Sequence, residues 1–290
     1  MKQRTLAAEV IFEGAGVHSG APVKVICRPA PSGWGLRFRR CGAAENEALK
    51  ADLDFTAPDD SLRRTVLRSP AGWAIETPEH LLACCAAFGL TNLEIEQSAA
   101  ETPILDGSAA PFAEGFLRAG IAEQDGPPAP EWTVNGPVAF RAGEAEIAAL
   151  PARDALLIAC FVEYPGSAIG SQAALWRWEG GEAFAREIAP ARTFALKRDI
   201  EALRAMGLIR GGSLECALVA DEKDYVNPPP RFENECARHK IIDLLGDLTL
   251  AGGLPRGHFM VFRAGHAAHL AFGRHLRKEN RVEWLNPPAN

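Results

Sequence analysis

Apolar and polar residues in the first half of the chain alternate in short runs separated by turn-forming residues. A period of two is typical of half-buried strands. Five runs follow it: Glu9–Phe12, Val23–Arg28, Thr65–Leu67, Trp73–Glu76 and Asn92–Gln97. A glycine-rich turn, Gly14–Gly20, joins the first two, and Ser69–Gly72 predicts a hairpin between the next pair.

Two helices are predicted between and after these strands. Thr77 looks like an N-cap with Pro78 at the first helical position, and the helix runs from there to a C-terminal cap at Gly89. Ser108 is expected to cap a second helix that reaches Leu117.

The second half repeats this mixture of strands and helices. The predicted strands are Val138–Ala149, Leu156–Glu163, Leu214–Ala220 and a final one at His258–Arg263. The predicted helices are Ala183–Glu187, Arg198–Ala205 and a long one, Phe232–Leu250, stopped by Gly252 and Gly253. Hairpins and short crossovers favour antiparallel sheets, so the fold class is α+β rather than a doubly wound parallel sheet.

The clearest boundary is Asp125–Pro130, which can continue neither a helix nor a central strand. We therefore predict an N-terminal α+β domain over residues 1–124, a linker over 125–131 and a C-terminal α+β domain over 132–290. The similar layout of the two halves suggests a duplicated unit.

Composition narrows the class of protein without naming a reaction. The 290 residues are 47% hydrophobic and 23% charged, as in globular proteins, and the net charge of −6 argues against a nucleic-acid partner. No signal segment or transmembrane run is evident, which predicts a cytoplasmic chain. Seven cysteines without CxxC spacing favour neither a disulfide framework nor a cysteine-rich zinc site.

His239 and Asp243 form the first candidate for chemistry. They are four residues apart in a predicted helix, so they lie on one face about one turn apart. An imidazole and a carboxylate so placed can share a divalent metal. Taken alone, the pair is more often a surface His–Asp helix pair.

Glu79 and His80 form the second candidate, at a predicted helix start. The positive end of the helix dipole disfavours imidazolium, and a neutral imidazole is the form that binds metal. Glu79 points in a different direction and could take a proton from a metal-bound water. The alternative for Glu79 is favourable capping by an acid in the first turn.

His266 is the third candidate, because it follows the last predicted strand and Gly265. A histidine in such a loop could protonate a leaving amine, and the nearby Arg263 could meet a phosphate. A loop histidine on the surface is the alternative.

Together these residues resemble the UDP-3-O-acyl-N-acetylglucosamine deacetylase family of lipid A biosynthesis. The resemblance spans residues 3 to about 270 in family order. It is carried by Gln3–Leu6, Gly14–Gly20, Glu79–Leu81, Pro103–Phe112, Ala191–Phe194, Gly211–Ser213, His239–Leu248 and Gly265–His266.

The resemblance implies a fold of two similar two-layer α/β sandwich domains with active-site inserts, which meet at a zinc ion. It implies that His80, His239 and Asp243 bind Zn²⁺, and Fe²⁺ is the alternative metal. The roles that it implies for other residues are a general base (Glu79), a general acid or electrostatic partner (His266), a group that orients it (Asp247) and an oxyanion stabiliser (Thr193). The implied substrate is an acylated UDP-amino sugar. Lys240 and Arg263 would contact its diphosphate, Phe194 would pack against its nucleotide–sugar part, and Leu208–Cys216 would enclose its acyl chain.

Several positions depart from the family pattern. Pro78 precedes Glu79, the family's His-Pro pair is absent around Gly166 and Ser167, and His269 stands where asparagine is usual. Two alternatives to removal of the N-acetyl group therefore stay open. They are a divergent zinc amidase for another N-acyl amino sugar and a non-catalytic member of the family. We expect a monomer, and acyl length is not specified by the sequence.

Overall fold

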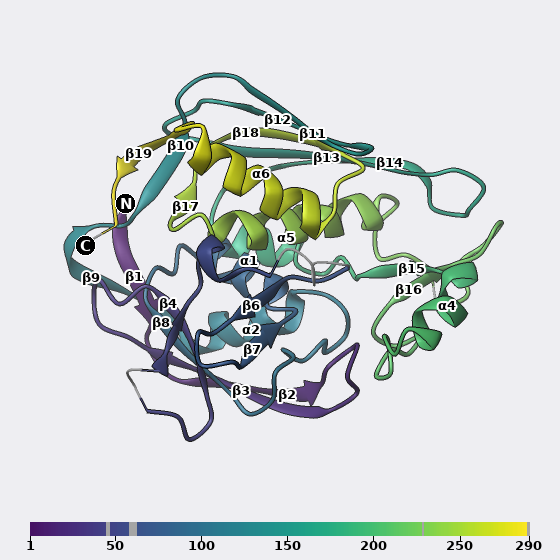
Figure 1. Ribbon diagram of the computed structural model, residues 1–290, viewed down its shortest axis with the longest axis horizontal. Coiled ribbons are helices and arrows are strands. Elements are labelled where there is room, and N and C mark those ends of the chain that lie inside the picture. Colours follow the sequence, from purple (N-terminus) through teal and green to yellow (C-terminus); the bar gives the residue numbers. More distant parts are fainter. Residues whose placement is uncertain (45–46, 58–62, 228, 289–290) are drawn as a thin grey trace.

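Two sheets enclose a layer of helices (Figure 1). The computed structural model describes residues 1–290 except 45–46, 58–62, 228 and 289–290. In Figure 1 one sheet lies along the top of the molecule and the other along the bottom, with α5 and α6 beneath the first and α1 and α2 above the second. The predicted α+β class is confirmed.

The first half contributes nine strands and two α-helices among the described residues. The strands are β1 (Lys2–Leu6), β2 (Val10–Ala15), β3 (Pro22–Pro29), β4 (Leu36–Arg40), β5 (Leu49–Lys50), β6 (Val66–Arg68), β7 (Ala74–Glu76), β8 (Leu93–Gln97) and β9 (Ile121–Pro128). The helices are α1 (Glu79–Phe88) and α2 (Ala110–Ala119), with a 3₁₀ turn, η2, at Leu53–Phe55.

The second half is built from the elements that follow. Its strands are β10 (Glu131–Val134), β11 (Val138–Ala142), β12 (Ala145–Leu150), β13 (Leu156–Tyr164), β14 (Gly170–Arg177), β15 (Phe194–Leu196), β16 (Leu218–Ala220), β17 (Leu254–Pro255), β18 (Gly257–Phe262) and β19 (Val282–Asn286). Its helices are α3 (Gly181–Glu187), α4 (Ile200–Ala205), α5 (Glu235–Thr249) and α6 (His266–Lys278), with a 3₁₀ turn, η4, at Lys197–Asp199.

The two five-stranded sheets have the same topology. Their strand orders are β2-β3-β8-β4-β5 and β11-β12-β18-β13-β14. In each sheet one neighbouring pair is parallel, β4 with β8 and β13 with β18, and the other pairs are antiparallel. One helix precedes the central strand in sequence and another follows it, so α1 corresponds to α5 and α2 to α6. This repetition supports the predicted duplication.

The helices meet in one hydrophobic core that both halves share. Leu81 and Leu82 of α1 and Ile241 and Leu245 of α5 are fully buried members of this core. The two helices approach closely at Gly246, where a Cβ atom would lie 2.2 Å from the carbonyl oxygen of Glu79. Glycine therefore brings the start of α1 against α5, and that contact carries the residues discussed below.

The segment predicted as one strand over Val138–Ala149 is a hairpin of β11 and β12, with its turn at Gly143. Gly143 has a φ of 60°, a left-handed conformation that glycine adopts readily. The prediction treated an apolar run as continuous and missed this turn. The strand expected over Leu214–Ala220 is likewise confined to β16.

The end of the chain differs most from the prediction. His266 is not in a loop, since it is the first residue of α6, and β18 is not the final strand, since β19 follows. The proline-rich segment predicted as the start of a linker instead continues β9 as far as Pro128. Among the described strands, β9 pairs only with β1, in a two-stranded sheet, so the prolines do not lie in a central strand. The division into domains at this segment stays a prediction.

Two further observations concern the chain as a whole. All seven cysteines are free, and six of them are buried. Within the described part of the chain, no helix combines the length and apolar character that crossing a membrane would need.

Candidate active site

The N-terminus of α1 brings two of the predicted residues into the interior. Thr77 does not cap this helix. It has a left-handed φ of 57° and its hydroxyl donates to Glu101, while Pro78 occupies the N-cap position without a side-chain cap. Glu79 and His80 follow at once and are only 2% and 5% exposed. Glu79 thus lies in the first turn of the helix, where the capping alternative places an acid, but it is buried.

His80 and the His239–Asp243 pair of α5 converge at the contact between the two helices. Asp243 Oδ1 lies 3.3 Å from His239 Nε2 and 3.8 Å from His80 Nε2. One ligand atom of each residue lies within 4.8 Å of those of the other two. The predicted i, i+4 pair is thus a buried cluster completed by the other half of the chain, and not a surface pair.

The cluster has the protonation state that a metal requires. Burial lowers the pKa of His80 to about 3 and also lowers that of His239. His239 Nδ1 lies 3.0 Å from the carbonyl oxygen of Ala191, to which it donates, so Nε2 presents its lone pair to Asp243. Asp243 Oδ1 is buried and has no hydrogen-bond donor. A buried acceptor without a partner is costly, and a cation between these three atoms would satisfy it.

Asp243 keeps its negative charge in spite of its burial. Burial raises its pKa, but Lys240 and the surrounding histidines outweigh this and hold it well below the usual value. Lys240 Nζ lies 2.8 Å from Oδ2 of Asp243. This ion pair turns one carboxylate oxygen toward the lysine and leaves Oδ1 facing the histidines.

Glu79 and His266 face each other beside the cluster. Their nearest side-chain atoms, Oε1 and Nε2, are 3.6 Å apart, and His266 Nε2 also lies 3.8 Å from Asp243 Oδ2. Burial raises the pKa of Glu79 to about 7. Burial lowers the pKa of His266, but the carboxylates of Asp247, Glu79 and Asp243 outweigh it and raise the pKa to about 10. A base and an acid of suitable strength are thus adjacent.

Asp247 lies one turn beyond Asp243 on α5 and contacts His266 at Nδ1, the ring nitrogen that does not face Glu79. His266 Nδ1 lies 2.8 Å from its Oδ2, and the Thr65 hydroxyl donates to its Oδ1 at 2.5 Å. His269 also approaches Oδ2, at 2.8 Å from its Nδ1. These contacts are compatible with the predicted orienting role of Asp247, which stays a prediction.

The cluster opens into a cleft of about 860 Å³ between the two halves. The predicted oxyanion stabiliser, Thr193, and the predicted substrate contacts Phe194, Lys240 and Arg263 line it. Of the predicted acyl-chain segment Leu208–Cys216, Ile209 lines it. Lys240 Nζ lies 5.5 Å above the Phe194 ring, and Arg263 pairs with Glu144 and Glu163 at the rim. The pairing of Lys240 with Asp243 was not predicted, although the i, i+3 spacing could have revealed it.

Sequence reasoning assigned no role to three residues that shape this site. Thr65 is fully buried against Asp247, and His18 lines the cleft. Glu101 accepts the backbone N–H groups of His18 and Ser19 at 2.7 Å and so fixes the glycine-rich turn. His18 lies in a motif that had been singled out, whereas Thr65 has no motif around it, and its partner is 182 positions away.

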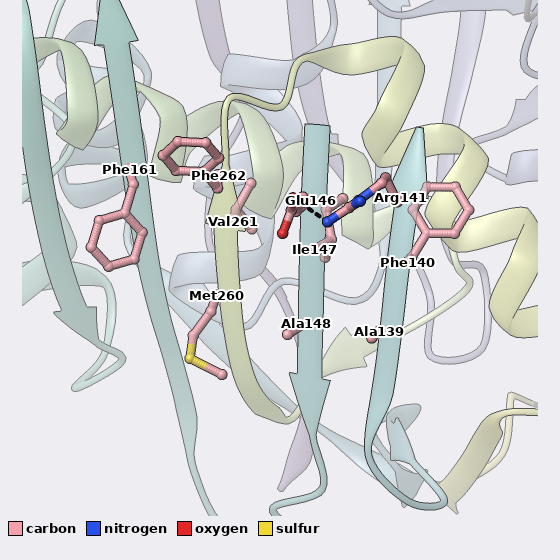
Figure 2. A pocket seen from close by; sticks show the side chains of 10 residues that line it. All are labelled: Ala139, Phe140, Arg141, Glu146, Ile147, Ala148, Phe161, Met260, Val261 and Phe262. Atoms are coloured by element: carbon pink, nitrogen blue, oxygen red, sulfur yellow. Dashed lines mark hydrogen bonds and ion pairs between the residues drawn. The ribbon is translucent and has the colours of Figure 1, made fainter. Parts of the chain in front are cut away.

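A second hollow, of about 410 Å³, lies on the outer face of the β11–β14 sheet (Figure 2). Apolar side chains such as Phe161, Met260 and Phe262 dominate it, and its charged groups, Arg141 and Glu146, pair with each other. None of the described residues that line it is a histidine or cysteine. The chemistry therefore belongs to the cleft between the halves.

The cleft contains what hydrolysis of an unactivated amide requires. Three neutral or anionic side chains that could hold a metal ion converge. A carboxylate with a pKa of about 7 can accept a proton, and an imidazolium can return one. No serine or cysteine nucleophile lies beside them in the described part of the cleft. The fold and the site define a metal-dependent hydrolase built from a duplicated α+β unit.

Comparison with known proteins identifies the family. The model of the family described as UDP-3-O-acyl N-acetylglycosamine deacetylase matches residues 3–278. A UDP-3-O-acyl-N-acetylglucosamine deacetylase of Thermosynechococcus vestitus is 38% identical, over 96% of this chain and 94% of its own length. Proteins of the same description from Myxococcus xanthus and Thermodesulfovibrio yellowstonii are 41% and 37% identical, over 91% and 99% of this chain and 83% and 95% of their own lengths.

The chain belongs to the UDP-3-O-acyl N-acetylglycosamine deacetylase family. It is accordingly a metalloenzyme that hydrolyses an amide in lipid A biosynthesis.

Proposed function

We propose that this chain uses Zn²⁺, held by His80, His239 and Asp243, to release acetate from UDP-3-O-((R)-3-hydroxyacyl)-N-acetylglucosamine. The observation that carries the proposal is the buried, unpartnered Oδ1 of Asp243, faced by two histidine nitrogens. Two imidazoles and one carboxylate form a ligand set typical of catalytic zinc, and Fe²⁺ accepts the same donors. When bound, the ion would polarise both the attacking water and the acetamide carbonyl.

Glu79 is the general base in this proposal. Its carboxylate is next to the ligand cluster in space, and a pKa of about 7 lets it accept the proton of the attacking water near neutral pH. Carbon–oxygen bond formation then gives a tetrahedral oxyanion, to which the Thr193 hydroxyl would donate a hydrogen bond.

His266 is the general acid. Its raised pKa keeps it protonated at neutral pH, and its Nε2 faces the cluster while Nδ1 is held by Asp247. Transfer of the Nε2 proton to the departing nitrogen would break the carbon–nitrogen bond and release the amine and acetate. Asp247 orients the ring and stabilises its charge throughout.

The rest of the cleft is suited to a substrate with an anionic end and an apolar end. Lys240 and Arg263 are the proposed diphosphate contacts, and Phe194 packs against the nucleotide–sugar part. The insert Leu208–Cys216 would enclose the acyl chain. Ile209 lines the cleft, and Gly211 donates to the carbonyl of Val17 in the opposite half, which closes this side of the cleft. A cytoplasmic location and a monomeric state stay predictions.

The acyl chain provides the test of substrate class. We expect kcat/KM for acetate release to fall when the 3-O-acyl group is removed, because each buried methylene contributes about 0.8 kcal/mol. Rates are compared for acylated and unacylated UDP-N-acetylglucosamine. Equal rates would favour the divergent amidase, and no acetate from any N-acetyl sugar in a panel would favour a non-catalytic member.

Arg263→Ala tests the anionic end. Loss of charge-assisted hydrogen bonds worth about 1.5–3 kcal/mol should raise KM for the UDP-sugar roughly 10- to 100-fold with little change in kcat. Arg141→Ala, on the outer sheet face and also ion-paired, is the matched control and should change neither constant. An unchanged KM in the Arg263 variant would remove this residue from the diphosphate site.

A further inference from the structure

Asp247 accepts hydrogen bonds from two imidazoles on the same oxygen. His266 and His269 are three residues apart in the first turn of α6, and the Nδ1 atom of each lies 2.8 Å from Asp247 Oδ2. The other oxygen, Oδ1, accepts from Thr65. Because the carboxylate offers only acceptors, both rings must carry a proton on Nδ1.

The two imidazoles differ in charge and in the groups that lie near their Nε2 atoms. His266 Nε2 faces Glu79 and Asp243. His269 is completely enclosed, its Nε2 has no hydrogen-bond partner, and burial lowers its pKa, so it is neutral. His269 is not among the residues that line the cleft. His269 is therefore connected to the reaction through its hydrogen bond to Asp247 and an edge contact with the His266 ring, whose centroid lies 6.0 Å away.

We propose that His269 is a positioning residue, whose Nδ1–H group fixes the Asp247 carboxylate and thereby the direction of the His266 ring. With His269 in place, Oδ2 is shared between two donors and Oδ1 is held by Thr65, so the carboxylate plane has one orientation. Without it, Oδ2 accepts from His266 alone, and the carboxylate loses one of the three hydrogen bonds that orient it. The His266 ring, which Asp247 holds at Nδ1, would then be less firmly directed toward the departing nitrogen.

An isosteric pair of substitutions separates hydrogen bonding from packing. Asparagine and leucine have nearly the same shape, but only asparagine can donate from the position of Nδ1. We expect His269→Leu to lower kcat about 10- to 100-fold with KM unchanged, the range typical of lost outer hydrogen bonds around a metal site. His269→Asn should restore most of the rate. Zinc content and thermal midpoint are measured for both variants.

A double-mutant cycle with His266→Ala tests whether the effect passes through His266. If it does, His269→Leu should leave the residual rate of the His266→Ala protein nearly unchanged. Equal losses in the leucine and asparagine variants, losses that multiply in the cycle, or a leucine variant that alone unfolds or loses zinc would overturn the proposal.

The inference rests on His266 as the proposed acid, and the same cycle distinguishes the two failures. A His266→Ala protein with full kcat contradicts the proposed function itself. A large loss in His266→Ala, combined with no loss in His269→Leu, contradicts only the role of His269.

Discussion

Replacement of Glu79 by glutamine should leave a protein that folds and binds zinc but releases acetate about 10²–10⁴-fold more slowly. The amide has the shape of the carboxylate but cannot accept a proton from water. Burial raises the pKa of Glu79 from 4.5 to about 7, so its ionisation lowers the free energy of unfolding progressively between these pH values and fully above pH 7. The neutral amide carries no such cost, and we expect the variant to be at least as stable as the parent.

Single-turnover kinetics, metal analysis and thermal unfolding of the Glu79→Gln protein check this result together. Glu146→Gln, on the exposed face of the second sheet, is the control and should behave like the parent. If the Glu79→Gln protein kept more than half of the parent activity, another group would have to be the general base, and His266 is the nearest candidate.

Removal of a ligand should have a larger effect, because it removes the metal from the reaction. We expect His80→Ala, His239→Ala and Asp243→Ala each to lower bound zinc sharply and to abolish measurable acetate release, since three protein ligands are the usual set in such sites. Asp243→Ala should also destabilise the fold by several kcal/mol. It leaves the ammonium group of Lys240, which is partly buried beside it at the cleft, without its carboxylate partner.

The control for the histidine variants is His258→Ala, in β18 of the second sheet. It should retain zinc and activity. If Asp243→Ala still bound about one zinc per chain, Asp243 would not be a ligand, and the unpartnered Oδ1 would need another explanation.

The parts of the site that lie close in sequence were predictable, because helical geometry fixes them. The i, i+4 spacing placed His239 and Asp243 on one face, and Glu79 and His80 were recognisable at a helix start. Taken alone, His239 and Asp243 favoured a surface helix pair, and Glu79 had helix capping as its alternative. Only the contact of α1 with α5, which Gly246 allows, brings the pairs together, and no local pattern encodes that contact.

The end of the chain was harder to predict for a local reason. Gly265 is the N-cap of α6 but makes no side-chain cap, so the helix start has the appearance of a strand-end loop. Missing α6 hid the i, i+3 relation of His266 and His269, and with it the shared carboxylate. Thr65 could not be found at all, since its role depends on a contact across the whole fold.

Zinc-dependent acetate release by this chain is the most direct test of the account. The purified protein is stripped of metal and assayed with the acylated UDP-N-acetylglucosamine, before and after addition of one equivalent of Zn²⁺, beside the Asp243→Ala protein treated identically. The account predicts no turnover without metal, recovery at one bound zinc per chain, and no recovery in the variant. Full activity of the metal-free protein, or equal recovery in Asp243→Ala, would contradict it.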